Sequence, residues 1–195
     1  MKNQNRFNEI SKRLFPRLKH IKNQNQQLII AFSGVPGSGK SELSRKLEEK
    51  YSAVRIRNDT IRDIIAHSGI FSILKEEREN LLEDYGEYLI RNYPFGNKLL
   101  ILDRSMDRQY KRFFPIFEEL RLKFFIIRLT MDKKGAIERI MKRKKGEDLD
   151  LVKRSMERWQ REFLDFGKNT HYDILINGEN PDFEKVCEKI DKILS

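Results

Sequence analysis

The stretch at residues 29–47 reads IIAFSGVPGSGKSELSRKL and constrains the fold more than any other part of the sequence. Residues 28–32 form a short, continuously apolar run, typical of a strand buried on both faces of a parallel sheet. Gly34, Gly37 and Gly39 follow, and residues 41–50 then have a helical pattern. The stretch therefore predicts a central strand, a glycine-rich loop and a helix, in that order.

The loop matches the pattern G-x-x-x-x-G-K-[ST] at Gly34, Gly39, Lys40 and Ser41. Glycines let successive backbone N–H groups turn inward around an anion, and the positive end of the following helix faces the same point. Lys40 can then reach the outer phosphates of a nucleotide, while the Ser41 hydroxyl ligates a magnesium ion that bridges them. A glycine-rich loop can also be a simple turn, but the strand before it and the helix after it favour nucleotide binding.

Four more strand-like runs follow, each separated from the next by a helical pattern, at residues 52–57, 98–103, 123–130 and 172–177. This alternation predicts an α/β fold with a five-stranded parallel sheet and helices on both faces. A length of 195 residues suits one compact domain, which we expect at residues 28–195. Ligands of such sheets bind beyond the carboxyl ends of the strands, so functional residues should follow strand ends.

A basic segment at residues 1–27 precedes the first strand. Its apolar residues are spaced as in an amphipathic helix, at Phe7, Ile10, Leu14, Leu18 and Ile21. We expect a helical extension that packs on the domain. The alternative is an arm that contacts nucleic acid or a protein partner, because basic amphipathic helices serve many purposes.

Forty Lys and Arg against thirty Asp and Glu give a formal net charge of +10. Such a charge favours a phosphate-rich partner through long-range attraction, so nucleic acid is a possible partner. The simpler explanation is a lysine-rich surface on an enzyme whose substrates are all anionic.

Cys187 has no second cysteine to pair with, which excludes disulfides and cysteine-based metal sites. No apolar stretch approaches the ~20 residues of a membrane span, and the polar N-terminal residues lack a signal-peptide core. We therefore expect a cytoplasmic protein without membrane contact, as a monomer or a weak homo-oligomer.

The second strand-like run leads into RNDTIRDII, which places Asp59 and Arg62 three residues apart and so on one face of a helix. A carboxylate at a strand end is well placed to accept a proton from an attacking hydroxyl. Asp59 can instead be only the N-cap of that helix, a role in which Asp is common.

The third run ends in LLILDRS, so Asp103 stands at the end of the strand and Arg104, Arg108 and Arg112 come next. Arginine suits bidentate binding of phosphate, which favours an anion-facing site over a carboxylate that merely caps a turn. The sequence leaves open which of the three arginines faces the cleft.

Residues 131–159 contain two helical patterns around a very basic centre, which we interpret as a lid at about residues 139–160. Arg139 and Arg143 are four residues apart and share a helix face. The second helix has an apolar stripe at Leu149, Val152, Met156, Trp159 and Phe163. A solvated, lysine-rich helix is the alternative to a lid.

Together these motifs resemble those of the P-loop kinases of small molecules and polynucleotide ends, which include bacteriophage-type polynucleotide 5′-kinase, chloramphenicol phosphotransferase and the zeta-toxin kinases. The resemblance covers residues 28 to about 180 and rests on GVPGSGKS, on Asp59 with Arg62, and on ERIMKR followed by DLVKRSM. It implies a P-loop NTPase three-layer sandwich with a helical lid, and ATP and Mg²⁺ as cofactors.

The resemblance also implies roles for individual residues. Asp59 would be the general base, and Arg62 would hold substrate phosphate or orient Asp59. Asp103 stands where these kinases carry a carboxylate that orients magnesium-bound water or substrate, with Arg104 on the substrate side, and Ser41 and Asp103 form the metal site. Arg143 would close over the transferred phosphoryl group. The residues implied to bind the nucleotide are Gly34, Pro36, Gly37, Ser38, Gly39, Lys40, Ser41, Glu42, Arg139 and, in the loop NGENP expected beside the adenine base, Gly178.

The sequence thus predicts an ATP-dependent kinase that phosphorylates a hydroxyl group, with Lys40, Asp59 and Arg143 as catalytic residues. The acceptor stays open among a nucleic-acid 5′ end, a nucleoside, a nucleotide sugar and an antibiotic. Two alternatives are a nucleotide-binding regulator with slow ATPase activity and a nucleic-acid-binding module that senses nucleotide.

Overall fold

The computed structural model describes the chain except residues 1, 19–22, 68–74, 93–95, 144–145 and 147. Its strands are β1 (Leu28–Ser33), β2 (Val54–Arg57), β3 (Leu99–Ser105), β4 (Phe124–Thr130) and β5 (Ile174–Asn177). Its helices are α1 (Lys2–Leu14), the 3₁₀ turn η1 (Phe15–Arg17), α2 (Lys40–Tyr51), α3 (Asn58–His67), α4 (Lys75–Asn92), α5 (Tyr110–Glu119), α6 (Lys133–Arg143), α7 (Leu149–Asn169) and α8 (Phe183–Leu194).

The strands form one five-stranded sheet in the order β2-β3-β1-β4-β5, and every neighbouring pair is parallel. β1 is central: its Ile30 lies beside Ile101 of β3 and Phe125 of β4. All six residues of β1 are buried, as expected for a strand covered on both faces. The predicted α/β fold is confirmed, and the carboxyl ends of all five strands meet at one edge of the sheet.

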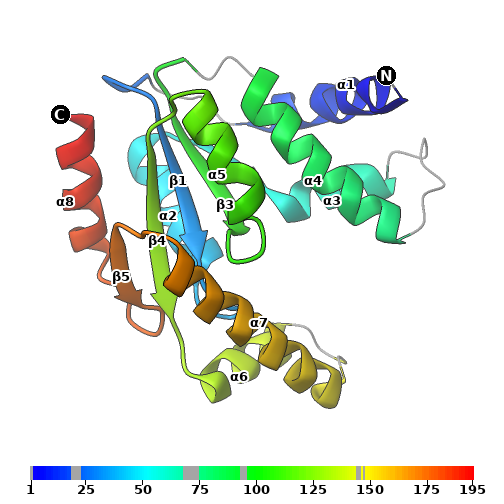
Figure 1. Cartoon of the computed structure of the whole chain (residues 1–195), viewed down its shortest axis with the longest axis vertical. Helices are drawn as coiled ribbons and strands as arrows, with labels where there is room; N and C mark the ends of the chain where they lie inside the picture. Colours follow the sequence, from blue (N-terminus) through cyan, green and yellow to red (C-terminus); the bar gives the residue numbers. More distant parts are fainter. Residues whose placement is uncertain (1, 19–22, 68–74, 93–95, 144–145, 147) are drawn as a thin grey trace.

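Helices cover both faces of the sheet, with α5 and α7 in front and α2 behind in the view of Figure 1. Alternate residues of β1 enter two separate hydrophobic cores. Ile30 and Phe32 pack with residues of α2 and α8, whereas Ile29 and Ala31 belong to the core that includes residues of α1, α3, α4, α5 and α7. Among the described helices, none has both the length and the apolar character needed to cross a membrane.

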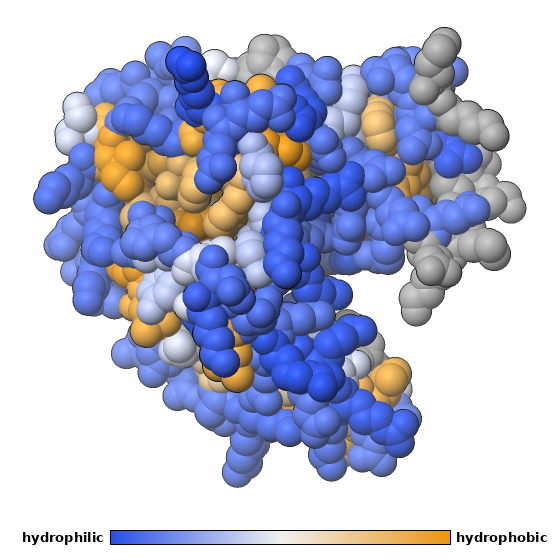
Figure 2. Space-filling view, viewed as in Figure 1, coloured by the Kyte–Doolittle hydropathy of each residue, from blue (hydrophilic) through white to orange (hydrophobic). Residues whose placement is uncertain are grey.

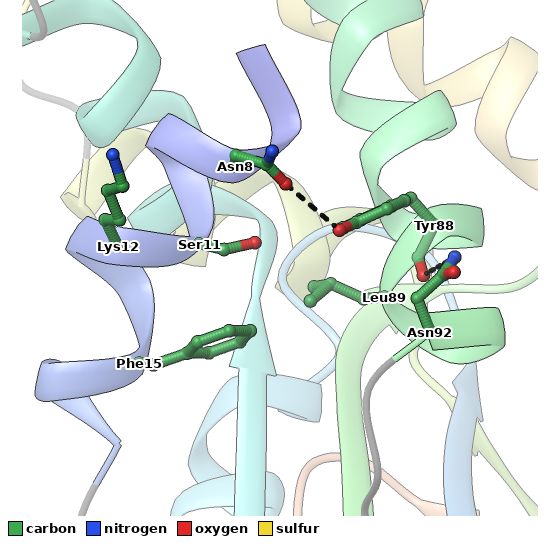
Figure 3. A pocket seen from close by; sticks show the side chains of 7 residues that line it. All are labelled: Asn8, Ser11, Lys12, Phe15, Tyr88, Leu89 and Asn92. Atoms are coloured by element: carbon green, nitrogen blue, oxygen red, sulfur yellow. Dashed lines mark hydrogen bonds between the residues drawn. The ribbon is translucent and has the colours of Figure 1, made fainter. Parts of the chain in front are cut away.

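The N-terminal helix α1 packs on the domain through Ile10 and Leu14, which are 1% exposed. Phe7 lies 4.9 Å from Tyr88 of α4 between ring centroids, and the Tyr88 hydroxyl donates to Asn8 across a cavity of about 460 Å³ between α1 and α4 (Figure 3). The predicted helix ends earlier than its apolar spacing indicates. A 3₁₀ turn containing a proline follows Leu14, and Leu18 is extended; Ile21 lies outside the described residues.

Two helices, α6 and α7, lie where the sequence predicts a lid, and we call them the lid helices. They pack around a small core of their own, in which Val35 of the glycine-rich loop packs with Ala136, Ile140, Val152 and Met156. Figure 2 shows the molecule hollowed beside the lobe that these helices form. The lid helices extend beyond the predicted residues 139–160 at both ends. The prediction that Leu149 belongs to the apolar stripe was wrong, because Leu149 begins α7, directly after the capping residue Asp148, and is 42% exposed.

Candidate active site

The glycine-rich loop connects β1 to α2 at the centre of the sheet edge. Gly37 has φ +86°, and a Cβ atom at this position would lie 2.6 Å from the Ala136 carbonyl oxygen of α6. A Cβ atom on Gly178, after β5, would lie 2.1 Å from the Ser38 carbonyl oxygen. Glycine is therefore required at both positions, since lid, loop and the β5 turn approach one another through their backbones.

Lys40 is folded back over this loop. Its Nζ atom donates to the carbonyl oxygens of Gly34 at 2.6 Å and Val35 at 2.8 Å. Burial lowers the pKa of Lys40 to about 8, although the negative charges of Asp107 and Asp103 act in the opposite direction. The cation is thus held inside the loop that would surround the phosphates of a nucleotide.

Ser41, Asp103 and Arg55 form a connected group beside Lys40. The Ser41 hydroxyl donates to Asp103 Oδ1 at 3.0 Å, and Arg55 Nη2 donates to Asp103 Oδ2 at 2.7 Å. Arg55 also donates to Glu48 of α2, and the side chains of Arg55 and Asp103 are 8% and 5% exposed. The sequence interpretation missed Arg55. A signal for it exists, because a charged residue inside a short buried strand needs an ionic partner.

Oxygen atoms of Ser41 and Asp103 are hard ligands, of the kind that magnesium prefers, and they lie within hydrogen-bond distance of each other. The described part of the chain contains no cluster of three or more His, Cys, Asp or Glu side chains suited to a metal. The two residues therefore fit a magnesium ion that takes its other ligands from nucleotide phosphates and water, as in P-loop sites.

Asp107 is a second residue that the sequence interpretation missed. Its Oδ2 atom accepts hydrogen bonds from the Gly34 backbone N–H at 2.9 Å and from the Ser105 hydroxyl at 2.6 Å. Asp107 is 5% exposed and holds Gly34, the first glycine of the loop, through this backbone hydrogen bond. Its position four residues after Asp103 gave no signal, because the contact with Gly34 depends on β1 and β3 being neighbours.

Asp59 lies in the first turn of α3, at the carboxyl end of β2, with its side chain 71% exposed. Arg62 Nη1 donates to Asp59 Oδ1 at 3.0 Å. Arg62 also forms a bidentate ion pair with Glu79 of α4, with both distances at 2.9 Å, and these hydrogen bonds raise the pKa of Arg62. Asp59 is the second residue of α3 rather than the residue before it, which disfavours the N-cap interpretation. Glu79 was missed because it lies seventeen residues away from Arg62 on another helix.

The lid arginines differ in their contacts. Arg139 Nη1 donates to the carbonyl oxygen of Gly178 at 3.0 Å and, more weakly, to that of Gly37 at 3.4 Å. Arg143 lies close enough to Lys40 for its charge to contribute to the lowered pKa of that lysine. Arg139 thus ties the lid to the loop, while Arg143 faces the same space as Lys40.

A cavity of about 480 Å³ joins most of these groups. The predicted site residues that line it are Pro36, Gly37, Gly39, Lys40, Ser41, Glu42, Asp59, Arg62, Asp103, Arg104, Arg139 and Arg143. Gly34, Ser38 and Gly178 do not line it. Within the loop Ser38 is fully buried, and after β5 the Gly178 N–H donates to the Thr130 carbonyl oxygen.

Of the three arginines that follow Asp103, Arg104 and Arg108 line the cavity. Arg108 pairs with Glu162 of α7 at 3.3 Å. Arg112 instead pairs with Asp84 and Glu87 of α4, at 2.7 and 3.1 Å. Arg112 therefore joins α5 to α4 and does not face the site.

Comparison with solved structures gives several kinases of the same fold. They include a deoxyadenosine kinase from M. mycoides solved with dCMP and dCDP (TM-score 0.53, 16% identity, 86% of this chain and 100% of that chain) and a gluconokinase from Sinorhizobium meliloti 1021 (TM-score 0.53, 15% identity, 89% and 100%). A third is a putative kinase from Chloroflexus aurantiacus j-10-fl (TM-score 0.57, 16% identity, 88% and 97%). At these identities the likeness concerns the fold alone.

None of the curated proteins matches the chain. The model of a family described as AAA domain matches residues 29–165, which is more than half of the chain. With its glycine-rich loop between β1 and α2 and its kinase-like parallel sheet, the chain belongs to this AAA domain family.

Proposed function

We propose that this protein transfers the γ-phosphoryl group of ATP to a hydroxyl group of an acceptor molecule. The observation that carries the proposal is the shared cavity, in which the nucleotide loop and the Asp59–Arg62 pair face the same space. A nucleotide-binding regulator needs only the loop. A kinase also needs room for an acceptor next to a base, and the cavity of about 480 Å³ provides it.

ATP would bind with its phosphates in the loop formed by Gly34, Pro36, Gly37, Ser38 and Gly39, with Glu42 at its rim. Lys40 would leave the loop carbonyl oxygens and turn to the outer phosphates. Ser41 and Asp103 would hold magnesium, which when bound neutralises negative charge on the phosphates. Gly178 and Arg139 would form the side of the site nearest the adenine base of ATP.

On the acceptor side, Asp59 would take the proton of the acceptor hydroxyl while that oxygen forms a bond to the γ-phosphorus. The bond from the γ-phosphorus to the bridging oxygen breaks, and ADP leaves. Arg62 orients Asp59 through the 3.0 Å hydrogen bond. Arg143 would meet the negative charge that develops on the transferred group, and Arg104 would contact the acceptor.

The proposal is tested by measuring transfer of labelled phosphate from ATP to a panel of acceptors that contains nucleosides, gluconate, nucleotide sugars, antibiotics and oligonucleotides with a 5′-hydroxyl. We expect one acceptor class to be labelled, and we expect Lys40→Ala to abolish the labelling without unfolding the protein. Hydrolysis of ATP at the same rate with and without every acceptor would instead favour a regulator with slow ATPase activity.

A nucleic-acid-binding module stays the third candidate, supported by the net charge of +10. Its discriminating property is affinity for RNA or DNA that falls steeply with salt, because such binding releases condensed counterions.

A further inference from the structure

Arg104 is a buried cation in the wall of the cavity. It follows Asp103 on β3, is 8% exposed, and its guanidinium carbon lies 4.5 Å from the centroid of the Phe113 ring. A Cβ atom on Gly86 of α4 would lie 2.7 Å from Arg104 Nη1, so the glycine provides space for the guanidinium. Burial lowers the pKa of Arg104 to about 10.

Two polar atoms of this side chain lack partners. Within the described residues, Arg104 Nε and Nη2 are buried without a hydrogen bond, and so is Gln109 Oε1 at the start of α5. The nearest favourable charge, Glu83 of α4, already accepts from Gln109 Nε2 at 2.8 Å and lies 3.6 Å from Arg112. Buried donors and acceptors of folded proteins are rarely left unpaired, so these three atoms call for an explanation.

Three other arginines nearby have carboxylate partners. Arg62 has Glu79, Arg108 has Glu162, and Arg112 has Asp84, each within 3.3 Å. Arg55 Nε is also buried without a hydrogen bond, but the Arg55 guanidinium pairs with Glu48 and Asp103. Arg104 instead packs against the Phe113 ring, and no ion pair in the described chain holds it away from the cavity that it lines.

The chemistry of the three atoms defines what can satisfy them. Nε and Nη2 form one edge of a planar guanidinium and donate two parallel hydrogen bonds. Gln109 Oε1 requires a donor, because its amide nitrogen is already bound to Glu83. A carboxylate or a phosphate offers acceptors only, and it would also face the Gln109 oxygen and the Glu83 carboxylate.

We propose that Arg104 and Gln109 recognise the part of the acceptor that does not react, and that this part is an uncharged heterocycle with a ring acceptor beside an amino donor. The inference rests on the proposed function and names its substrate class. A nucleoside with an amino-bearing base has this edge together with a free hydroxyl. A sugar acid and a 5′-phosphate group do not have it.

The test uses the whole protein and three soluble probes. Cytidine and adenosine have a ring nitrogen acceptor beside an amino donor, whereas uridine has an N–H and a carbonyl oxygen in the corresponding places. Calorimetry in the presence of a non-hydrolysable ATP analogue should give at least tenfold tighter binding of cytidine or adenosine than of uridine. Equal binding of all three probes, or binding of none of them, would overturn the inference.

Arg104→Met removes the donors and keeps an apolar side chain over Phe113. We expect Arg104→Met to weaken binding of the preferred nucleoside at least tenfold and to raise the KM for that nucleoside at least tenfold. The KM for ATP should stay unchanged and the Tm should not fall, since a buried unpaired charge is lost. Arg112→Met is the matched control, because it removes an arginine with carboxylate partners: its Tm should fall and its nucleoside affinity should stay.

The two proposals fail in different ways. If the wild-type protein binds cytidine or adenosine as expected but transfers no phosphate to any acceptor, the proposed function fails and the recognition site stands. If the protein phosphorylates gluconate or an oligonucleotide and Arg104→Met leaves the KM of that acceptor unchanged, the inference fails and the kinase stands.

Discussion

Lys40 is a cation held by the backbone of its own glycine-rich loop. The ammonium group is buried and bound to loop carbonyl oxygens, and burial lowers its pKa from 10.5 to about 8. A lysine with a lowered pKa carries less charge in the folded than in the unfolded chain at moderately alkaline pH. The positive charge of Lys40 therefore lowers the stability of the fold.

The first prediction follows from this pKa. The cost of the Lys40 charge is fully present below pH 8 and disappears as pH rises toward 10.5, where the unfolded chain also loses the proton. The free energy of unfolding of the wild-type protein should thus rise relative to Lys40→Met between pH 8 and 10.5, by about 3 kcal/mol in all. Denaturant titrations of both proteins across this range measure the difference, and parallel curves would contradict the pKa.

Asp107 provides the second prediction. Asp107→Ala leaves the buried Gly34 N–H without its acceptor and removes the shorter of the two hydrogen bonds of the Ser105 hydroxyl, which should cost about 1–3 kcal/mol of unfolding free energy. The KM for ATP should rise, because Gly34 begins the loop. Asp63→Ala, on the exposed surface of α3, is the control and should change neither quantity. A variant at Asp107 that loses stability but keeps the wild-type KM for ATP would show that the loop keeps its shape without this bond.

At the scale of elements, the prediction that goes furthest concerns the lid helix α6. Arg143 ends α6 and lines the cavity, and an arginine that meets charge on the transferred phosphoryl group contributes ~10³-fold or more to rate. The lysine ammonium lacks the planar, bidentate donors of a guanidinium, so Arg143→Lys should lower kcat with little effect on ATP affinity.

The control for the lid is Lys142→Ala, the exposed neighbour on the same helix, which should be nearly neutral. Lys144 and Lys145, which the sequence also suggests as solvent-facing, lie outside the described residues. Equal losses in Arg143→Lys and Lys142→Ala, with a parallel loss in salt, would show that the lid acts through diffuse attraction for a polyanionic acceptor.

The strands and helices of this fold can be predicted from the sequence because the patterns that indicate them are local. The apolar run before Gly34 and the alternation of strands and helices predicted the central strand and the parallel sheet. For Arg55 the sequence signals only that a charge in a buried strand needs a partner, and for Asp107 and Glu79 it gives no signal, since their contacts with Asp103, Gly34 and Arg62 span 48, 73 and 17 residues. The first two contacts depend on strand order, and the third on how α4 packs against α3, which no local pattern encodes.

For the whole molecule, the packing of α1 decides whether the N-terminal extension is part of the domain. Ile10 is 1% exposed in the core that α1 shares with α3, α4 and the sheet. Ile10→Ala should therefore lower the free energy of unfolding by about 2–5 kcal/mol, measured by denaturant titration. Arg13→Ala, on the exposed face of the same helix, should have no such effect. An unchanged stability of Ile10→Ala would identify α1 as a detachable arm.

In the proposed function, a nucleotide-binding loop after β1 and a general base on α3 act across one cavity of the molecule. Asp59→Asn tests it most directly, because the side chain is exposed and contributes little to the fold. With the best acceptor of the panel, kcat should fall ~10²–10⁴-fold, the usual contribution of a positioned general base, while ATP affinity and Tm stay at wild-type values. A kcat within a few-fold of the wild type, or a loss of kcat accompanied by an equal loss of stability, would contradict the account.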